Sequence, residues 1–278
     1  MFDPKIADLI LFKLPSKRYP LTRLSVTVIT KNESKNIADC LRSVRFADQL
    51  LVLDSGSTDN TVEIARSLGA EVTSSLDWPG FGRQKNRALD AITNDWILSI
   101  DADERITPKL ALEITTALQH ADAASESVAF EIPRLTQFCG VWIRHCGWTP
   151  DHVLRLFKRG EARFSDDLVH EKVLLTHADT KVVRLKNPLL HYSYPAPEHY
   201  WRKLQNYSQE WARQRYARGQ TATMTRAALA AVAAFLRSYI FRLGFLDGAM
   251  GFAVCAMQAQ SAFGKYFELY CLGREHEK

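Results

Sequence analysis

The tripeptide Asp101-Ala102-Asp103 directly follows an apolar segment, residues 96–100. Residues two apart in an extended chain point to the same side, so the two carboxylates can face one ligand. Paired carboxylate oxygens suit Mg²⁺ or Mn²⁺, which bind one or two carboxylates together with substrate phosphates. The motif therefore predicts a metal and diphosphate site at Asp101 and Asp103. In the alternative interpretation, Asp103 caps the following turn and Asp101 is solvated.

A second polar cluster, residues 54–59 (DSGSTD), follows another apolar segment. A carboxylate in the place of Asp54 can accept hydrogen bonds from the base or the ribose of a nucleotide. The alternative is an ordinary turn between a strand and a helix, with Asp59 as its cap. Lys85 and Arg83 belong to a basic segment and could reach a diphosphate, although a solvated face is the preferred interpretation for Arg83.

Short apolar segments alternate with helical patterns over the first half of the chain. Strands are expected at residues 24–30, 49–53, 71–73 and 96–100, and helices at residues 33–44, 60–68, 82–92 and from Pro108 onward. This alternation predicts βαβ units and a mainly parallel sheet. Ligands of such sheets bind beyond the carboxyl ends of the strands. Because residues 30–33, 54–59 and 101–103 follow such ends, we expect these three polar clusters to converge.

Several segments resemble a known family. The set TVITKNES, LLVLDSGSTDNTVEIA, GRQKNRALDA and DWILSIDADERI resembles the nucleotide-binding half of glycosyltransferase family 2, which has the GT-A fold. The later segments DHVLRLFKRG, LVHEKV, PLLHYSYP and RLGFLDGAMGF resemble a narrower branch, the bacterial lipopolysaccharide core β-1,4-glucosyltransferases. The resemblance predicts an α/β GT-A domain, with a Rossmann-like mixed and mainly parallel sheet flanked by helices, and a C-terminal helical extension.

The resemblance also implies an inverting sugar transfer from a nucleoside-diphosphate sugar. UDP-glucose is favoured as the donor through the family branch alone, and Mg²⁺ or Mn²⁺ is the implied cofactor. The implied acceptor is a glycolipid or oligosaccharide such as the lipopolysaccharide inner core, with an exopolysaccharide or a lipid carrier as alternatives. The implied nucleotide-sugar contacts are Thr30, Asn32, Glu33, Asp54, Ser55, Gly56, Lys85, Asp101 and Ala102.

Inversion requires one carboxylate to take the proton of the acceptor hydroxyl as that hydroxyl attacks the anomeric carbon. The Glu-Asp pair of many family members is absent, and His170-Glu171 stands in its place. Glu171 is the first candidate base and Asp151 the second, while His170 could orient the base or a substrate. His191 is a candidate third metal ligand, since imidazole binds Mn²⁺. Either histidine could instead be structural.

The expected organisation has three parts. Residues 1–23 form an N-terminal extension, and residues 24–198 form the catalytic domain, with a nucleotide-sugar half at 24–127 and an acceptor half at 128–198. In the acceptor half, residues 128–132, 153–157 and 172–175 look like strands without long crossover helices. Residues 199–278 are expected to be helical.

The helical part is basic. Residues 199–246 hold eight Arg or Lys and one acid, Glu210, a net charge of +7 in a chain whose total is +5. Interleaved aromatic residues suit a lipid headgroup layer, which predicts peripheral contact with an anionic membrane, through arginines such as Arg213, Arg215 and Arg218. The alternative is a packed helical subdomain with a solvated arginine face. Residues 227–236 are only about ten apolar residues, too short to span a bilayer, so no transmembrane helix is expected.

Other features limit the function classes. The N-terminus has no secretory signal pattern, and the five scattered cysteines fit free thiols in the cytosol, so we expect a protein of the cytoplasmic face of the inner membrane. The spacing of Cys139, His145, Cys146 and His152 matches no common zinc pattern. A nucleotidyltransferase would carry a Gly-rich basic loop after the first strand, where this chain has Lys31-Asn32-Glu33-Ser34. Acids at the sheet edge argue against a nucleic-acid-binding protein, and no nucleic-acid partner is expected.

Overall fold

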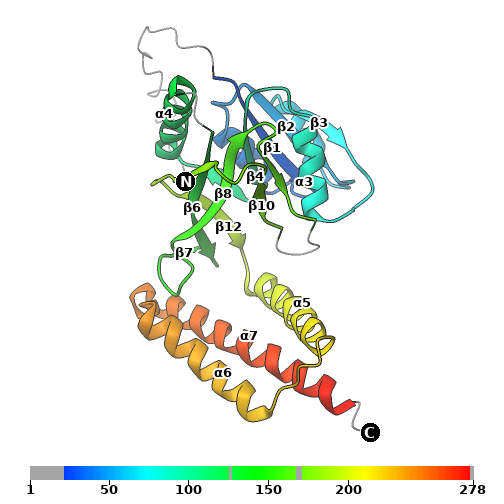
Figure 1. The fold of residues 1–278 in the computed structure, drawn as a ribbon, viewed down its shortest axis with the longest axis vertical. Helices are drawn as coiled ribbons and strands as arrows, with labels where there is room; N and C mark the ends of the chain where they lie inside the picture. Colours follow the sequence, from blue (N-terminus) through cyan, green and yellow to red (C-terminus); the bar gives the residue numbers. More distant parts are fainter. Residues whose placement is uncertain (1–21, 125–126, 167–170, 276–278) are drawn as a thin grey trace.

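The computed structural model describes residues 22–124, 127–166 and 171–275. Its first half contains four parallel strands: β1 (Leu24–Thr30), β2 (Gln49–Asp54), β3 (Glu71–Ser74) and β4 (Trp96–Asp101). They lie in the order β3-β2-β1-β4, with β1 central (Figure 1). All four were predicted from short apolar segments separated by helical patterns. The predicted N-terminal extension, residues 1–23, lies almost wholly outside the described residues.

The sheet continues through strands of the second half. β8 (Asp151–Lys158) pairs antiparallel with both β4 and β6 (Val128–Phe138), and β12 (Leu189–Tyr194) then pairs parallel with β6. β5 (Glu104–Ile106) lies at the far edge beside β12, and β7 (Val141–Ile143) and β11 (Lys181–Arg184) also pair with β6. A separate small sheet joins β9 (Ala162–Phe164) to β10 (Val173–Leu175).

Helices cover both faces of the main sheet. α1 (Ile37–Ser43), α2 (Thr61–Ser67) and α4 (Pro108–Ala124) pack with the strand residues of one face, such as Leu98. α3 (Phe81–Asp90) and the β9–β10 sheet pack with the other face, which includes Ile97. Successive strand residues point to opposite faces, so a strand covered on both sides must be apolar throughout, as WILSI nearly is.

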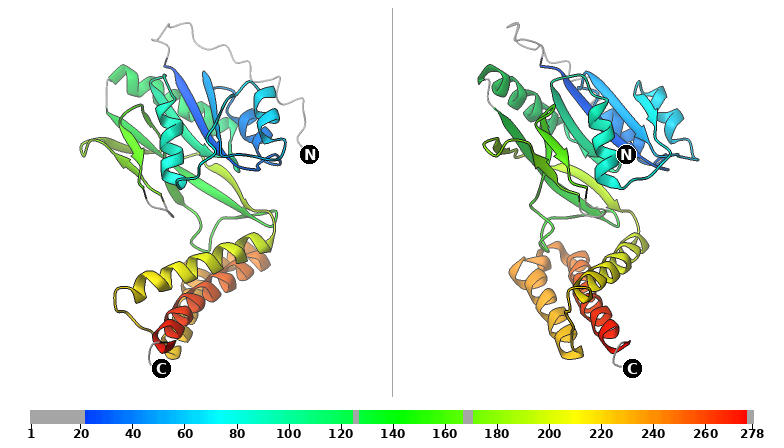
Figure 2. Two further views of the ribbon diagram at one scale, coloured as in Figure 1. Left: turned by 90° about the vertical axis from the view of Figure 1, so that its right-hand side faces the viewer. Right: turned by 45° about the vertical axis from the view of Figure 1, so that its right-hand side comes forward.

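A helical extension follows the sheet. It contains α5 (Pro197–Tyr216), α6 (Met224–Leu236), a π-helical turn η2 (Arg237–Phe241), a 3₁₀ turn η3 (Gly244–Asp247) and α7 (Gly248–Glu275). α7 packs against both α5 and α6, and the three helices lie together at one end of the molecule (Figures 1 and 2). The predicted fold class, a mixed sheet flanked by helices with a C-terminal helical extension, is confirmed.

An apolar and aromatic cluster joins this extension to the sheet. Phe138 at the end of β6 and Tyr194 at the end of β12 contact Tyr200 of α5, at ring-centroid distances of 6.0 and 5.5 Å. Trp148 packs on the same rings, and Val254 of α7 belongs to the same cluster. Aromatic pairs at these distances contribute beyond their buried area, so the extension is docked on the strand ends.

The apolar stretch of the helical part is longer than expected. The sequence predicted an apolar stretch limited to residues 227–236, but the helix starts earlier, at Met224, and continues directly into η2. Within the described part of the chain, one stretch, Met224–Phe241, reaches the length and composition of a membrane-crossing helix: 18 residues with a mean hydropathy of 1.3. Only 11% of that stretch is buried. Length and composition do not make it a span, but its apolar surface faces outward.

Candidate active site

The carboxyl ends of β1, β2 and β4 bring the polar clusters together. Thr30 is level with Asp54 across the β1–β2 pair, and Ile29 is level with Asp101 across the β1–β4 pair. A cavity of about 930 Å³ opens at these ends. The predicted site residues that line it are Thr30, Glu33, Lys85, Asp101, Ala102, Asp103, Glu171 and His191. Residues separated by up to 161 positions in the sequence thus share one cavity.

Two cations hold the carboxylate of Asp101. The ammonium of Lys85 lies 2.8 Å from Oδ1, and the guanidinium of Arg155 lies 2.6 Å from Oδ2. Burial would raise the pKa of Asp101, but the charges and hydrogen bonds of Arg155 and Lys85 hold it well below its usual range. Asp101 is therefore ionised and held in position by two cations, although part of its side chain is still exposed.

Lys85 also pairs with the candidate base. Its Nζ lies 2.9 Å from Oε1 of Glu171, so one ammonium bridges Asp101 and Glu171. The Lys85 side chain is only 3% exposed and lies over the ring of Phe164, 5.2 Å from its centroid. Lys85 thus points into the cavity, whereas Arg83 is exposed, 3.4 Å from Asp166, as the preferred interpretation expected.

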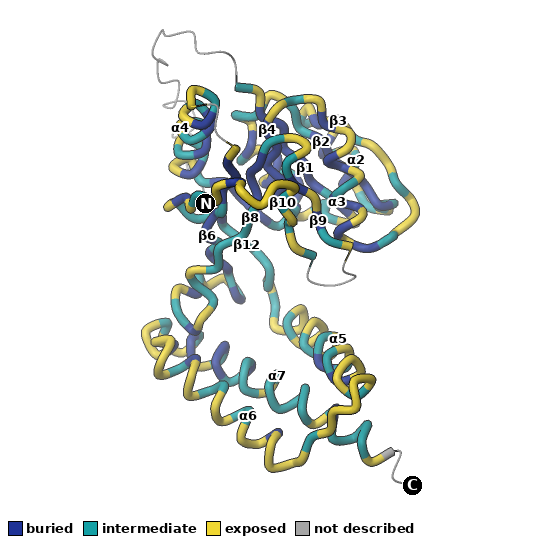
Figure 3. Tube along the Cα trace, viewed as in Figure 1, coloured by how far each residue is buried: buried dark blue, intermediate teal, exposed yellow. Residues whose placement is uncertain are grey.

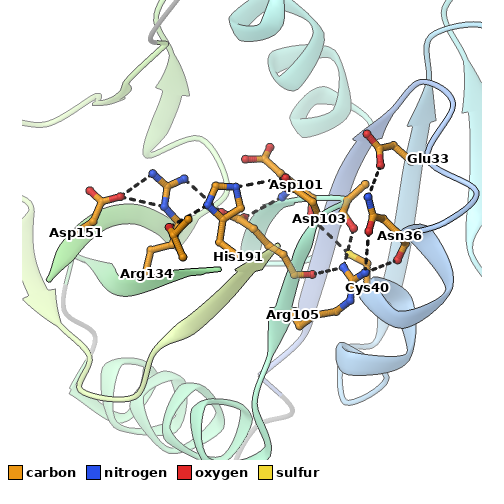
Figure 4. A network of polar contacts seen from close by, with 12 residues as sticks. Glu33, Asn36, Cys40, Asp101, Asp103, Arg105, Arg134, Asp151 and His191 are labelled. Carbon is orange, nitrogen blue, oxygen red and sulfur yellow. Dashed lines mark hydrogen bonds and ion pairs between the residues drawn. The ribbon is translucent and has the colours of Figure 1, made fainter. Parts of the chain in front are cut away.

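Asp103 faces a different partner. Its Oδ2 lies 3.3 Å from Nε2 of His191, whose Nδ1 lies 3.3 Å from the hydroxyl of Thr136 (Figure 4). Burial raises the pKa of Asp103, but the hydrogen bond and charge of His191 lower it below its ordinary value. The amide of Tyr192 donates to the Asp103 carbonyl, which ties the motif to β12.

Three charged residues of the ion-pair network around Asp101 were missed by the sequence argument. Glu104, fully buried, accepts from the amide of Asp101 at 2.9 Å and from Arg155 at 3.0 Å. Arg134 lies 3.6 Å from Glu104 and holds Asp151 at 2.6 Å (Figure 4). An arginine within residues 153–157 (VLRLF), which are otherwise apolar, was the available signal for Arg155, because a charge in a buried strand needs a partner.

The second candidate base lies outside the cavity. Asp151 is 42% exposed, bound by Arg134, and does not line the cavity, whereas Glu171 does. His170 lies outside the described residues. Of the irregularly spaced histidines and cysteines, His145 and Cys146 both contact Asp247, whereas His152 lines the cavity.

Asp54 and its neighbours organise their own loop. The Asp54 carboxylate is buried and accepts from the Thr30 hydroxyl and from the Gly56 and Ser57 amides. Asn32, with a φ of 58°, cross-links the two loops by accepting from the Thr58 amide at 2.8 Å. In this structure Asn32, Asp54, Ser55 and Gly56 are not among the residues that line the cavity. Their predicted contact with a nucleotide stays a prediction.

The alternative interpretation of Asp59 has direct support. Asp59 accepts from the amide and hydroxyl of Thr61, the first residue of α2, and from the amide of Ser34. The Thr61 hydrogen bond lowers the pKa of Asp59 to about 2. Asp59 lies one residue before Asn60, the N-cap of α2, so it stabilises the start of the helix from outside the cap position and ties it to the loop after β1.

Of the three predicted metal ligands, Asp101, Asp103 and His191, only two are arranged to bind a divalent ion. Asp103 and His191 offer an oxygen and a nitrogen side by side, and metal ions of this kind can take remaining ligands from phosphate and water. Asp101 is already paired with two cations. Across the described ranges, no three His, Cys, Asp or Glu side chains converge as a metal-holding group. Asp103 and His191 are therefore the better candidates.

The geometry agrees with the comparisons to known proteins. The model of Glycosyl transferase family 2 matches residues 25–142. An uncharacterized glycosyltransferase of Rickettsia prowazekii (strain Madrid E) is 30% identical over 239 residues, which cover 84% of this chain and 81% of the relative. The chain belongs to glycosyl transferase family 2. The expected enzyme class, a glycosyltransferase, is thereby confirmed.

Two further likenesses have narrower coverage. The lipopolysaccharide core biosynthesis glycosyltransferase LpsC of Rhizobium meliloti (strain 1021) is 30% identical over 165 residues, 56% of this family 2 glycosyltransferase and 58% of LpsC. A glucosyl-3-phosphoglycerate synthase from Mycobacterium tuberculosis, solved with Mn²⁺ and UDP, is 28% identical and covers 42% of this chain and 44% of its own. Its TM-score of 0.34 is too low for its ligands to be carried over.

Gly82 provides a test of the site geometry in this glycosyltransferase. A Cβ at Gly82 in α3 would lie 1.9 Å from the carbonyl oxygen of Ser165. The amide of Ser165 donates to the carbonyl of Lys172, the neighbour of Glu171. Gly82→Ala should therefore push Glu171 away from Lys85. We expect activity to fall about tenfold or more and the free energy of unfolding to fall by about 1–3 kcal/mol.

Gly264→Ala is the matched control. A Cβ at Gly264 in α7 has its nearest neighbour, the Ser208 hydroxyl, at 3.5 Å, which is an ordinary contact. Activity assays and urea unfolding of both variants check the prediction. Equal activity and stability in Gly82→Ala and the wild-type protein would contradict the packing of α3 on Ser165.

Proposed function

We propose that this glycosyltransferase moves glucose from UDP-glucose, with inversion, to a hydroxyl of a lipopolysaccharide inner-core acceptor at the cytoplasmic face of the inner membrane. The observation that carries the proposal is the joint placement of Glu171, Lys85 and Asp101 in one cavity with Asp103. One bound substrate could therefore reach both the candidate base, Glu171, and the two carboxylates predicted to hold a metal ion and its diphosphate, Asp101 and Asp103. Similarity to LpsC, named for lipopolysaccharide core biosynthesis, supports this acceptor class.

In the proposed reaction, Glu171 acts as the general base. The acceptor oxygen attacks the anomeric carbon, the bond from that carbon to the diphosphate oxygen breaks, and the hydroxyl proton passes to the carboxylate. Lys85 contacts Oε1 of Glu171, which leaves Oε2 for the acceptor. By holding Oε1, the ammonium also fixes the direction of the carboxylate, and such positioning lowers the barrier.

The departing diphosphate needs positive charge. Lys85 and Arg155 line the cavity beside Asp101, and Lys31 and Lys203 line it as well. Asp103 and His191 would hold Mg²⁺ or Mn²⁺, which when bound supplies charge that stabilises the leaving group. Asp101 then has a separate role, because it keeps two cations in place beneath the diphosphate.

A donor panel tests the proposed function. Purified protein with Mn²⁺ or Mg²⁺ is mixed with a series of nucleotide sugars, and donor hydrolysis and transfer to isolated lipopolysaccharide core are measured. We expect UDP-glucose to be consumed fastest. Transfer of another sugar would overturn the donor assignment alone. Absence of both hydrolysis and transfer with every donor would overturn the proposed activity.

Glu171→Gln tests the base. This change keeps the shape of the side chain and removes its basicity, so kcat should fall about 10²-fold or more while donor binding persists. Glu63→Gln, at an exposed position of α2, is the control and should be unaffected. An active Glu171→Gln together with an inactive Asp151→Asn would exchange the two roles.

Asp103→Ala and Asp101→Ala test the division of labour between the two carboxylates. Both should abolish transfer, but their stabilities should differ. Among the described residues, Asp103 has one ion-pair partner, His191. Asp101→Ala instead removes one partner each from Lys85 and Arg155, which keep Glu171 and Glu104, and should lower the free energy of unfolding by about 1–3 kcal/mol. Full activity in EDTA, or wild-type rates in Asp103→Ala, would remove the metal assignment.

A further inference from the structure

The outer face of α6 carries an apolar stripe. Leu229, Val232, Leu236 and Ile240 are all exposed, and their spacing of three, four and four places them on one helix face. Leu229 is 64% and Val232 57% exposed. The opposite face packs on α7, with Ala227 fully buried. Figure 3 shows that α6 is mostly exposed along its length. A helix of a soluble protein normally has polar residues on such a face.

The stripe ends in an aromatic tip. Phe241, which is 80% exposed, is followed by four further exposed apolar residues: Leu243, Phe245, Leu246 and Phe252. Two rings of this tip pack on Tyr239, Phe245 at 6.2 Å and Phe252 at 5.8 Å between ring centroids. We define the outer face of α6 and η2 together with this tip as the apolar stripe.

The tip is fixed to the catalytic part. The buried carboxylate of Asp247 in η3 accepts from the amides of Arg144 and His145 and lies 2.8 Å from Nδ1 of His145. The amide of Cys146 donates to the carbonyl of Arg242. Whatever the stripe contacts, the catalytic part is therefore held at a defined angle to it.

Positive charge flanks the stripe. Arg226, Arg237 and Arg242 are exposed, and Asp247 is the one acid in residues 222–252. The Asp247 side chain is buried and paired with His145, so it does not offset these arginines at the surface. An apolar surface bordered by unbalanced arginines is complementary to an anionic lipid leaflet, where aliphatic and aromatic side chains enter the acyl boundary and arginines meet the phosphates.

We propose that the apolar stripe docks on an anionic bilayer, with α6 lying in the plane of the interface. A spanning orientation does not fit the packing. α6 is packed along α7, which carries Gln258, Gln260, Lys265 and Glu268, so α6 could not cross the hydrocarbon without taking these polar groups with it. Arg237 lies within the stretch itself. In-plane binding buries the stripe and leaves α7 in water.

Docking through the apolar stripe would hold the cavity at a fixed position relative to the lipid leaflet. Lys203 and Tyr207 of α5 line the reaction cavity, and α5 packs on α7, which supports the stripe. The helical extension lies beyond the carboxyl ends of β6 and β12 (Figure 2). The carboxyl ends of β1 and β4, at the same end of the sheet, line the cavity. A membrane-held acceptor would thus meet the cavity close to its own surface. The membrane location of the acceptor belongs to the proposed function, whereas lipid docking rests on the stripe alone.

Flotation of the full chain with vesicles tests the docking, without nucleotide or acceptor. We expect binding to phosphatidylcholine vesicles containing phosphatidylglycerol and weak binding to phosphatidylcholine alone. The double variant L229S/V232S should bind the anionic vesicles about tenfold or more weakly, since it removes two large apolar side chains from the contact. L112S is the matched control, because Leu112 on α4 of the catalytic part is at least as exposed as Leu229, and it should bind like the wild type.

Salt and charge variants separate the stripe from the cationic helix α5. High salt screens charges but not apolar contacts, so part of the binding should survive it. The triple change of Arg213, Arg215 and Arg218 to Ser should weaken binding less than L229S/V232S does. Complete release by salt, or release by the triple change with L229S/V232S still bound, would overturn the stripe as the docking surface.

A second copy of the chain is the competing occupant. Light scattering of the wild type and L229S/V232S in solution tests it. If the wild type is a dimer that L229S/V232S converts to a monomer, and neither floats with vesicles, the stripe is a dimer interface and the proposal fails. Donor hydrolysis should be equal in all variants, so failure of the docking is distinguishable from failure of the proposed reaction.

Discussion

The ammonium of Lys85, bridging Asp101 and Glu171, is the interaction on which the arrangement of the site depends. A buried charge is tolerated only when it is paired and hydrogen-bonded, so Lys85 requires both carboxylates to be where they are. Asp101 comes from the end of β4, Lys85 from α3, and Glu171 from the segment before β10. The close approach of α3 to Ser165, possible because residue 82 is glycine, brings the last of these within reach.

The charge network extends from this bridge into the acceptor half. Asp101 binds Arg155 of β8, Arg155 binds Glu104, and Glu104 lies beside Arg134 of β6, which holds Asp151. The network therefore crosses the antiparallel junction at which the parallel strands meet the second half of the sheet. It also gives the two acids of the motif different surroundings. Asp101 is surrounded by cations, whereas Asp103 and His191 face the cavity as a pair that can take up a further ligand.

The helical extension contributes to the site as well as to the proposed membrane contact. Its aromatic junction with β6 and β12 places α5 so that Lys203 and Tyr207 enter the cavity lining. Asp247 fixes the other end of the extension to the loop after β7. Two attachments at different places limit rotation of the helices relative to the sheet, so the apolar stripe and the cavity keep a defined relation.

The sequence by itself determined the parallel half of the sheet, its helices and the Asp101-Ala102-Asp103 motif at a strand end. Strands, helices and turns follow from the spacing of apolar residues and from the residue types at turns, and both can be read along the sequence. Only the tertiary structure decided that Asp101 is bound by Arg155 and Lys85, that Glu104 and Arg134 join them, and that Asp151 lies outside the cavity. Ion pairs form between residues far apart in the chain, and no local pattern specifies which charge meets which. The same holds for α6. Its sequence shows that it is apolar, but only its packing on α7 decides that Leu229 and Val232 face outward. Burial depends on the neighbours of a residue as well as on its type.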